Sequence, residues 1–87
     1  MTLEFPNPSR SFDERRNAVR FTGHDGMFEV PFLVEASVLA RAGKSVLSES
    51  ELLVAFDAAR KSILDVAREA YSHGRRNIYT LTAADFR

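Results

Sequence analysis

The dipeptide His24-Asp25 is the first place in this sequence where side chains could do chemistry. Imidazole and carboxylate groups are common metal ligands and proton carriers. A metal needs three or four ligands, however, and the only other histidine, His73, stands far away near the expected end of a helix. Asp25-Gly26 is also a common turn dipeptide for backbone reasons alone. We therefore expect no metal site and assign no catalytic residue.

Arg60 is the second candidate, because it falls inside the apolar arc of a predicted helix, between Phe56 and Leu64. An unpaired guanidinium is costly to bury. The side chain therefore either extends to the rim of the apolar surface on its aliphatic stem or meets a carboxylate. Asp85 and Glu49 are the carboxylates we consider, together with the acidic group of a ligand or partner.

Basic residues beside an aromatic ring form a third candidate. Arg75 and Arg76 precede Tyr79, and Arg15-Arg16 lies in another expected turn. Such a surface could bind RNA or single-stranded DNA, although arginines near a helix C-terminus also complement the helix dipole. The 12 Lys+Arg residues are balanced by 12 Asp+Glu, which argues against a nucleic-acid binder that relies on bulk charge.

Composition and motifs exclude several other classes. The chain has 87 residues and no Cys, so thiolate zinc sites and cysteine nucleophiles are ruled out. No glycine-rich phosphate loop, Gly-x-Ser-x-Gly elbow or HExxH motif occurs. Apolar runs are far shorter than the ~20 residues of a membrane span, and no signal peptide is recognisable. We expect a cytoplasmic, non-enzymatic protein without a cofactor or a membrane partner.

The first third of the chain has the period-two pattern of strands. Residues 1–9 contain Pro6 and Pro8 and are expected to be an extended lead-in, and residues 10–87 a single domain. Phe12 is expected opposite Val19, across a polar turn at residues 14–17.

The next turn, Gly23-His24-Asp25-Gly26, leaves the strand register open. A two-residue loop would pair Phe21 with Val30, and a four-residue loop would pair Phe21 with Phe28. We prefer the four-residue loop, because it places Pro31, which has no N–H, near the strand end.

Helical spacing follows. A short helix is expected over residues 35–42, with Val38 and Leu39 inward and Gly43 at its end. Ser48 to Glu51 has the form of a capping box and predicts one continuous helix over residues 49–72. Its apolar positions follow a 4-3-4-3-4 spacing: Leu52, Phe56, Ala59, Ile63, Val66 and Ala70.

A last strand is expected at residues 78–81, and Thr82 to Asp85 predicts one helical turn that returns Phe86 to the body. The resulting order is β-β-β-α-α-β. The fold class is therefore α+β: an antiparallel sheet of three to four strands with two helices packed on one face.

In order and spacing, several pieces of this sequence resemble the family called domain of unknown function 1488. The resemblance runs from Phe12 to Phe86, and the pieces that carry it are Phe12-Asp13, Ala18 to Phe21, Gly23 to Gly26, Arg60, Ile63, Ala67, Tyr71 and Leu81 to Phe86. It implies a compact α+β domain of bacterial origin with no assigned activity, and it transfers no catalytic residue.

An interaction module is what remains, and a length argument favours self-association. A continuous helix over 49–72 would be about 36 Å long, whereas a compact domain of this size is only about 30 Å across. The excess apolar surface would be covered either by the first helix and the Pro6/Pro8 lead-in or by a second copy, and we prefer the second copy because two-fold association is common. We expect a homodimer through this helix or an unknown protein partner, with weak RNA or single-stranded DNA binding as the alternative. The candidate interaction residues are Arg60, Tyr71, Arg75, Arg76, Tyr79 and Asp85.

Overall fold

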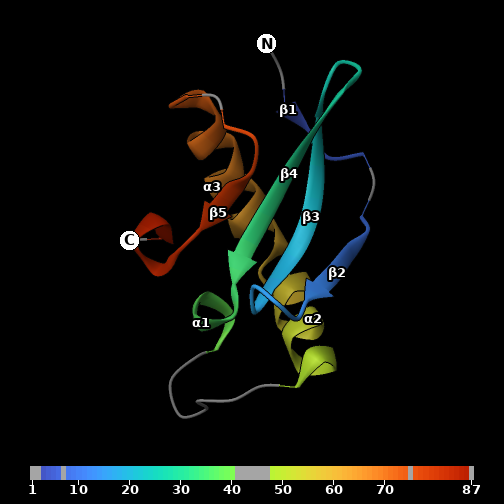
Figure 1. The fold of residues 1–87 in the computed structure, drawn as a ribbon, viewed down its shortest axis with the longest axis vertical. Coiled ribbons are helices and arrows are strands. Elements are labelled where there is room, and N and C mark those ends of the chain that lie inside the picture. Colours follow the sequence, from blue (N-terminus) through green and yellow to red (C-terminus); the bar gives the residue numbers. More distant parts are fainter. Residues whose placement is uncertain (1–2, 7, 41–47, 75, 87) are drawn as a thin grey trace.

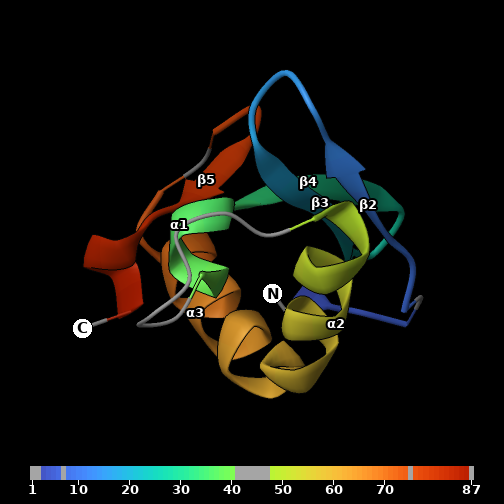
Figure 2. The same ribbon diagram turned by 90° about the horizontal axis from the view of Figure 1, so that it is seen from below.

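The computed structural model describes residues 3–6, 8–40, 48–74 and 76–86. In these residues a five-stranded, mostly antiparallel sheet is covered on one face by helices (Figures 1 and 2). The predicted α+β class, with two main helices on one face of the sheet, is confirmed. The elements are β1 (Leu3–Glu4), β2 (Arg10–Asp13), β3 (Ala18–Asp25), β4 (Phe28–Glu35), α1 (Ala36–Leu39), α2 (Glu49–Ala58), α3 (Arg60–Ser72), β5 (Tyr79–Leu81) and the 3-10 turn η1 (Ala83–Phe86).

The β3–β4 hairpin forms the centre of the sheet, and its register differs from the one we preferred. Phe21 lies opposite Phe32, not Phe28, because the turn is the two-residue segment Gly26-Met27. Gly26 has φ +63°, which suits the first central position of a type II′ turn. This register pairs eight residues of each strand. The observed partner of Phe21 lies four residues beyond the predicted one, so both registers place the same side chains on the core face.

Pro31 lies inside β4, where the sequence led us to expect an end of pairing. The Ala36 N–H donates to the Asn17 carbonyl at 2.9 Å, in the pair that continues the β3–β4 register. Because hydrogen-bonded and non-bonded pairs alternate, the odd-numbered residues of β4 direct their backbone groups away from β3, toward β5. β5 pairs with β4 only from Phe32 onward. The missing N–H of Pro31 therefore leaves no ladder bond unmade.

The N-terminal strands complete the other side of the hairpin. Phe12 lies opposite Val19, as predicted, and the turn at residues 14–17 is present with Asn17 at φ 51°. The predicted lead-in contributes a strand that the expected order lacked. Leu3 and Glu4 pair with Asp25 and His24, and Leu3 is buried.

The predicted continuous helix over residues 49–72 is wrong, because the chain breaks at Ala59 into α2 and α3. The capping box of Ser48 and Glu51 is confirmed. Ala59 has φ −105° and ψ 12°, outside the helical range, and the chain changes direction there (Figure 2). This bend lets Leu52 and Phe56 of α2, and Ile63 and Ala67 of α3, all reach the core. The length argument for a dimer loses its premise, because it required a straight helix.

The remaining elements are shorter than expected. α1 ends at Leu39, which is buried as predicted, whereas Gly43 lies outside the described residues. β5 runs parallel to β4, because the two helices carry the chain back along the sheet before it re-enters. Within Thr82 to Asp85, the Thr82 N–H donates to the Asp85 carboxylate at 2.7 Å, and Phe86 packs against the core.

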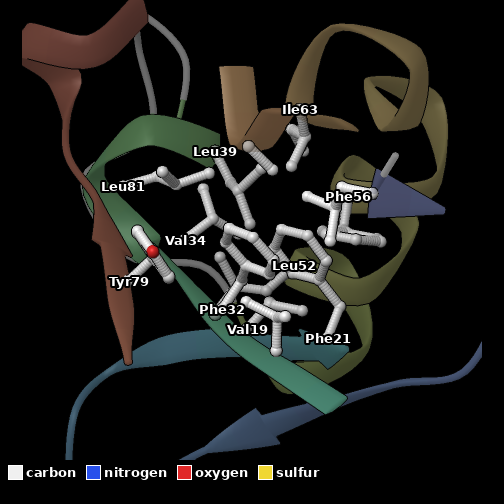
Figure 3. Packing of buried hydrophobic residues seen from close by; sticks show 13 residues of the cluster. Val19, Phe21, Phe32, Val34, Leu39, Leu52, Phe56, Ile63, Tyr79 and Leu81 are labelled. Carbon is white, nitrogen blue, oxygen red and sulfur yellow. The ribbon is translucent and has the colours of Figure 1, made fainter. Parts of the chain in front are cut away.

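Aromatic rings around Phe32 form the centre of the core (Figure 3). The Phe32 ring lies 5.3 Å from Phe21, 5.1 Å from Tyr79 and 5.8 Å from Phe5, measured between ring centroids. Phe56 of α2 lies 5.2 Å from Phe21. Such ring pairs add about 0.5 to 1.5 kcal/mol each beyond their buried area. The cluster joins the segment that follows β1, the hairpin, α2 and β5.

Gly23 provides a test of this packing. A Cβ at residue 23 would lie 2.8 Å from Cε1 of Phe5 and 3.0 Å from Cδ1 of Leu3. We predict that Gly23→Ala lowers the free energy of unfolding by about 1 to 3 kcal/mol, although alanine is the better residue in a strand interior. Urea denaturation measures the change. In the Gly23→Ala background Phe5→Leu should cost less than it does alone, and fully additive effects would contradict the proposed clash.

Candidate functional site

Arg60 meets a carboxylate, but neither of those considered from the sequence. Its guanidinium donates to Asp57 at 2.8 Å and to the Pro8 carbonyl at 3.0 Å. It also lies over the Phe56 ring, 4.9 Å from the centroid. Asp85 and Glu49 are therefore wrong as partners. The apolar-arc position is explained by the guanidinium, which stacks on the Phe56 ring while its N–H groups reach Asp57 and the Pro8 carbonyl.

Asp57 is shared by two arginines at the bend between α2 and α3. Arg10 of β2 forms a two-pronged pair with it, at 2.9 Å from Nε and 2.8 Å from Nη2. The hydrogen bond from Arg10 is the main reason that the pKa of Asp57 lies below its ordinary value of 3.8; desolvation opposes the shift, and Arg60 adds to it. All three side chains are thus engaged in holding β2 and residue 8 to the helices.

The other predicted residues are not brought together as one basic surface. Arg15 and Arg16 lie in the turn before β3, whereas Arg76 lies beside the turn after it. These turns stand at opposite ends of an eight-residue strand, about 26 Å apart. Asp85 is engaged with Thr82, and Arg75 lies outside the described residues. Tyr79 is buried, so its ring has no face for a nucleotide base.

Tyr71 and Tyr79 instead hold the end of the molecule where the β3–β4 hairpin turns. The Tyr71 hydroxyl donates to the Asp25 carboxylate at 2.5 Å. The Tyr79 hydroxyl donates to the Gly74 carbonyl at 2.6 Å and accepts from the Arg76 N–H at 3.1 Å. The two rings pack edge to face at 5.8 Å. These contacts tie the hairpin turn, the end of α3 and the approach to β5 into one unit.

This end of the molecule carries large exposed apolar side chains. Met27 is 97% exposed and Phe28 77% exposed. A groove of about 570 Å³ lies beside them and is also lined by Glu29, Tyr71 and Arg76. We call these five residues the tip surface. The tip of the hairpin projects beyond the end of α3 (Figure 1). Exposed apolar side chains that gather beside a groove are typical of interaction sites.

Sequence reasoning named Tyr71 and Arg76 as candidates without placing them at the hairpin turn, and it missed Met27 and Phe28. Phe28 was expected to pair with Phe21 inside the hairpin, and only the observed register moves it to the exposed tip. Methionine directly after Gly26, in a turn, was the available signal, since turn positions are usually polar. Among the described residues, no three His, Asp or Glu side chains form a group that could hold a metal ion.

Fold and site together define a small α+β domain with an apolar, groove-bearing end. The sequence matches the family model described as protein of unknown function (DUF1488) over residues 3–82, and the chain belongs to this family. Its fold is similar to the crystal structure of a DUF1488 protein of unknown function from Shewanella loihica PV-4. The TM-score is 0.79 at 16% identity, covering 93% of this chain and 94% of that one. No curated protein matches the sequence. Within the described residues, no helix is both long and apolar enough to span a membrane.

The ion pairs of Asp57 predict a pH dependence of stability. Because the folded pKa is lowered, the pairs stabilise the protein above the unfolded pKa near 4, and this contribution is lost as the pH falls through the folded pKa. Asp57→Asn should cost about 0.5 kcal/mol at pH 7, a modest value because solvent screens the pairs. Urea titrations should show a smaller loss of stability in acid for this variant. Asp65→Asn, whose ion pair with Arg68 is longer at 3.7 Å, is the control. If the loss of stability in acid were reduced equally in both variants, it could not be assigned to Asp57.

The hydrogen bond from Tyr71 to Asp25 predicts that the hairpin turn loosens when the hydroxyl is removed. Tyr71→Phe should lower the free energy of unfolding by about 1 kcal/mol. Amide hydrogen exchange should accelerate at residues 25–28 more than at residues 18–21. Uniform acceleration along β3 would show instead that the hydroxyl has no local role.

Proposed function

We propose that this protein is a non-enzymatic accessory module that binds another protein through the tip surface. The observation that carries the proposal is the exposure of Met27 and Phe28 on a hairpin that is held in place. Burial of two such side chains against a partner contributes several kcal/mol of association free energy. Because Tyr71 and Asp25 hold the turn in place, less conformational entropy is lost on binding.

The state of the carboxylates supports a binding role over a catalytic one. Asp57 is paired with two arginines, Asp85 accepts from Thr82, and Asp25 accepts from Tyr71. A general acid or base must reach a substrate proton. Each of these groups is instead engaged in a structural contact.

RNA or single-stranded DNA remains the alternative partner, and the geometry favours it less. Binding a single strand requires a continuous cationic track with open aromatic faces. The described arginines Arg15 and Arg16 stand at the other end of the sheet from Arg76, and Tyr79 is buried. At the tip surface, Phe28 and Arg76 provide one exposed ring and one positive charge, which is less than a continuous cationic track.

A pair of surface variants tests the proposal. We predict that Met27→Ser/Phe28→Ser keeps the far-UV spectrum and stability of the native protein but loses its partner in affinity capture from extracts of its source cells. The matched control is Val54→Ser, since Val54 is the other large exposed apolar side chain in the described residues, at 66%, and lies on α2. This variant should retain the partner.

Three outcomes would contradict the proposal. The partner could remain bound to the Met27→Ser/Phe28→Ser variant, or the captured material could be nucleic acid that is released by nuclease. Sedimentation at micromolar concentration could also show a dimer that dissociates in the Val54→Ser variant. That last result would return the contact to the segment 49–72, as the sequence led us to expect.

A further inference from the structure

The edge of β4 beside the tip surface carries backbone groups that no described strand pairs. Odd-numbered residues of β4 direct their N–H and C=O groups away from β3, as the Asn17–Ala36 hydrogen bond establishes. Leu33 faces β5, which begins opposite Phe32. Glu29 and Pro31 lie before that point. Because Phe32 lies opposite Tyr79 in this parallel pair, the Tyr79 N–H donates to the Pro31 carbonyl. The outward groups that β5 leaves unpaired are therefore the N–H and C=O of Glu29.

The groove is located where an added strand would lie. Glu29 and Pro31 line it on one side, and Arg76 and Asn77, on the approach to β5, line it on the other. The core face of β4 continues past Val30, which is buried, to Phe28, which is exposed. An extended segment paired with Glu29 would thus place alternate side chains against Phe28 and Tyr71.

The positive charge of Arg76 predicts a further feature of the partner segment. Arg76 is exposed, and its guanidinium forms no ion pair among the residues described. A carboxylate is the group that a free guanidinium at the rim of a groove binds best. The partner segment should therefore combine β-branched or aromatic residues with an acidic one.

From these observations we infer that an extended, acidic and apolar segment of the partner protein adds to the edge of β4 at Glu29, in line with β5. This inference rests on the proposed function and names the mode of binding at the same site. The segment donates to the Glu29 carbonyl and accepts from the Glu29 N–H. Its acidic side chain pairs with Arg76.

A second copy of this chain fits the edge poorly. Antiparallel pairing of two β4 edges about a two-fold axis at Glu29 would set the two Glu29 carboxylates directly opposite each other, and like charges at such positions are destabilising. Pro31 offers no donor to the second copy. Proline and charge on a strand edge are common devices against self-pairing.

The backbone contribution can be tested separately from the side chains. Glu29→Pro removes the outward N–H and keeps the pairing with β3, and Pro31 shows that an outward position of β4 accommodates proline. Glu29→Ala is the matched control, which removes the charge and keeps the N–H. The probe is a fluorescein-labelled peptide, Thr-Val-Glu-Val-Thr-Val, blocked at both ends. The control peptide has the same sequence but is N-methylated at alternate residues, so that one of its edges cannot donate hydrogen bonds to a strand.

We expect fluorescence anisotropy to show saturable binding of the peptide to the native protein. Glu29→Pro should weaken binding about tenfold, and Glu29→Ala about twofold or less. In the native protein, the Glu29 amide should exchange with solvent more slowly when the peptide is present, a readout that does not depend on how the variant folds.

Other results would overturn the inference. These are equal binding by the N-methylated peptide, unchanged affinity in Glu29→Pro, or no protection of the Glu29 amide at about 1 mM peptide, a concentration at which even weak strand addition is detectable. If Glu29→Pro keeps the cellular partner that Met27→Ser/Phe28→Ser loses, the proposed function stands and strand addition is wrong.

Discussion

The pairing of Phe21 with Phe32 across the β3–β4 hairpin is the constraint on which the rest of the structure depends. It stacks the two rings and presents them to Phe5, Phe56 and Tyr79, which come from three other parts of the chain. The same register decides which backbone groups of β4 face β5, and it places Met27 and Phe28 at the exposed turn. A shift of one residue would turn every one of these side chains to the opposite face.

The bend at Ala59 allows the helical segment to follow the twisted sheet. A straight helix over residues 49–72 would follow one direction, whereas the sheet twists beneath it. Breaking the helix allows Phe56 to pack on Phe21 while Ile63 and Ala67 cover the other part of the core. Arg10 and Arg60 converge on Asp57, two residues before the break, so the charges are concentrated where the two helices and β2 meet. Burial decides the position of the helices, and the ion pairs hold the junction.

The tip surface combines rigidity with exposed apolar area. Tyr71 donates to Asp25 at the hairpin turn and Tyr79 donates to the Gly74 carbonyl near the end of α3, so polar contacts hold this end in addition to the core. A small domain needs its core for stability. This arrangement leaves the core packed and still exposes two large apolar side chains to a partner. This division between a packed body and an exposed end is the reason for placing the proposed contact at the tip.

Four features could be predicted from the sequence: the class of fold, the cap at Ser48, the turn at residues 14–17 and the pairing of Phe12 with Val19. Each of these depends on neighbours close in the chain or on a simple alternation. The hairpin register, the break at Ala59 and the strand at Leu3 were decided only in the tertiary structure. Alternation is unchanged when a register shifts by four residues, and the 4-3-4-3-4 spacing is the same in a straight helix and in two helices joined at one residue. Asp57 lies only three residues before Arg60, so that ion pair was within reach of the sequence. The arrival of Arg10 at Asp57 depended on where β2 and the bend meet, and the exposure of Phe28 on where α3 stops. Long-range packing alone sets those positions.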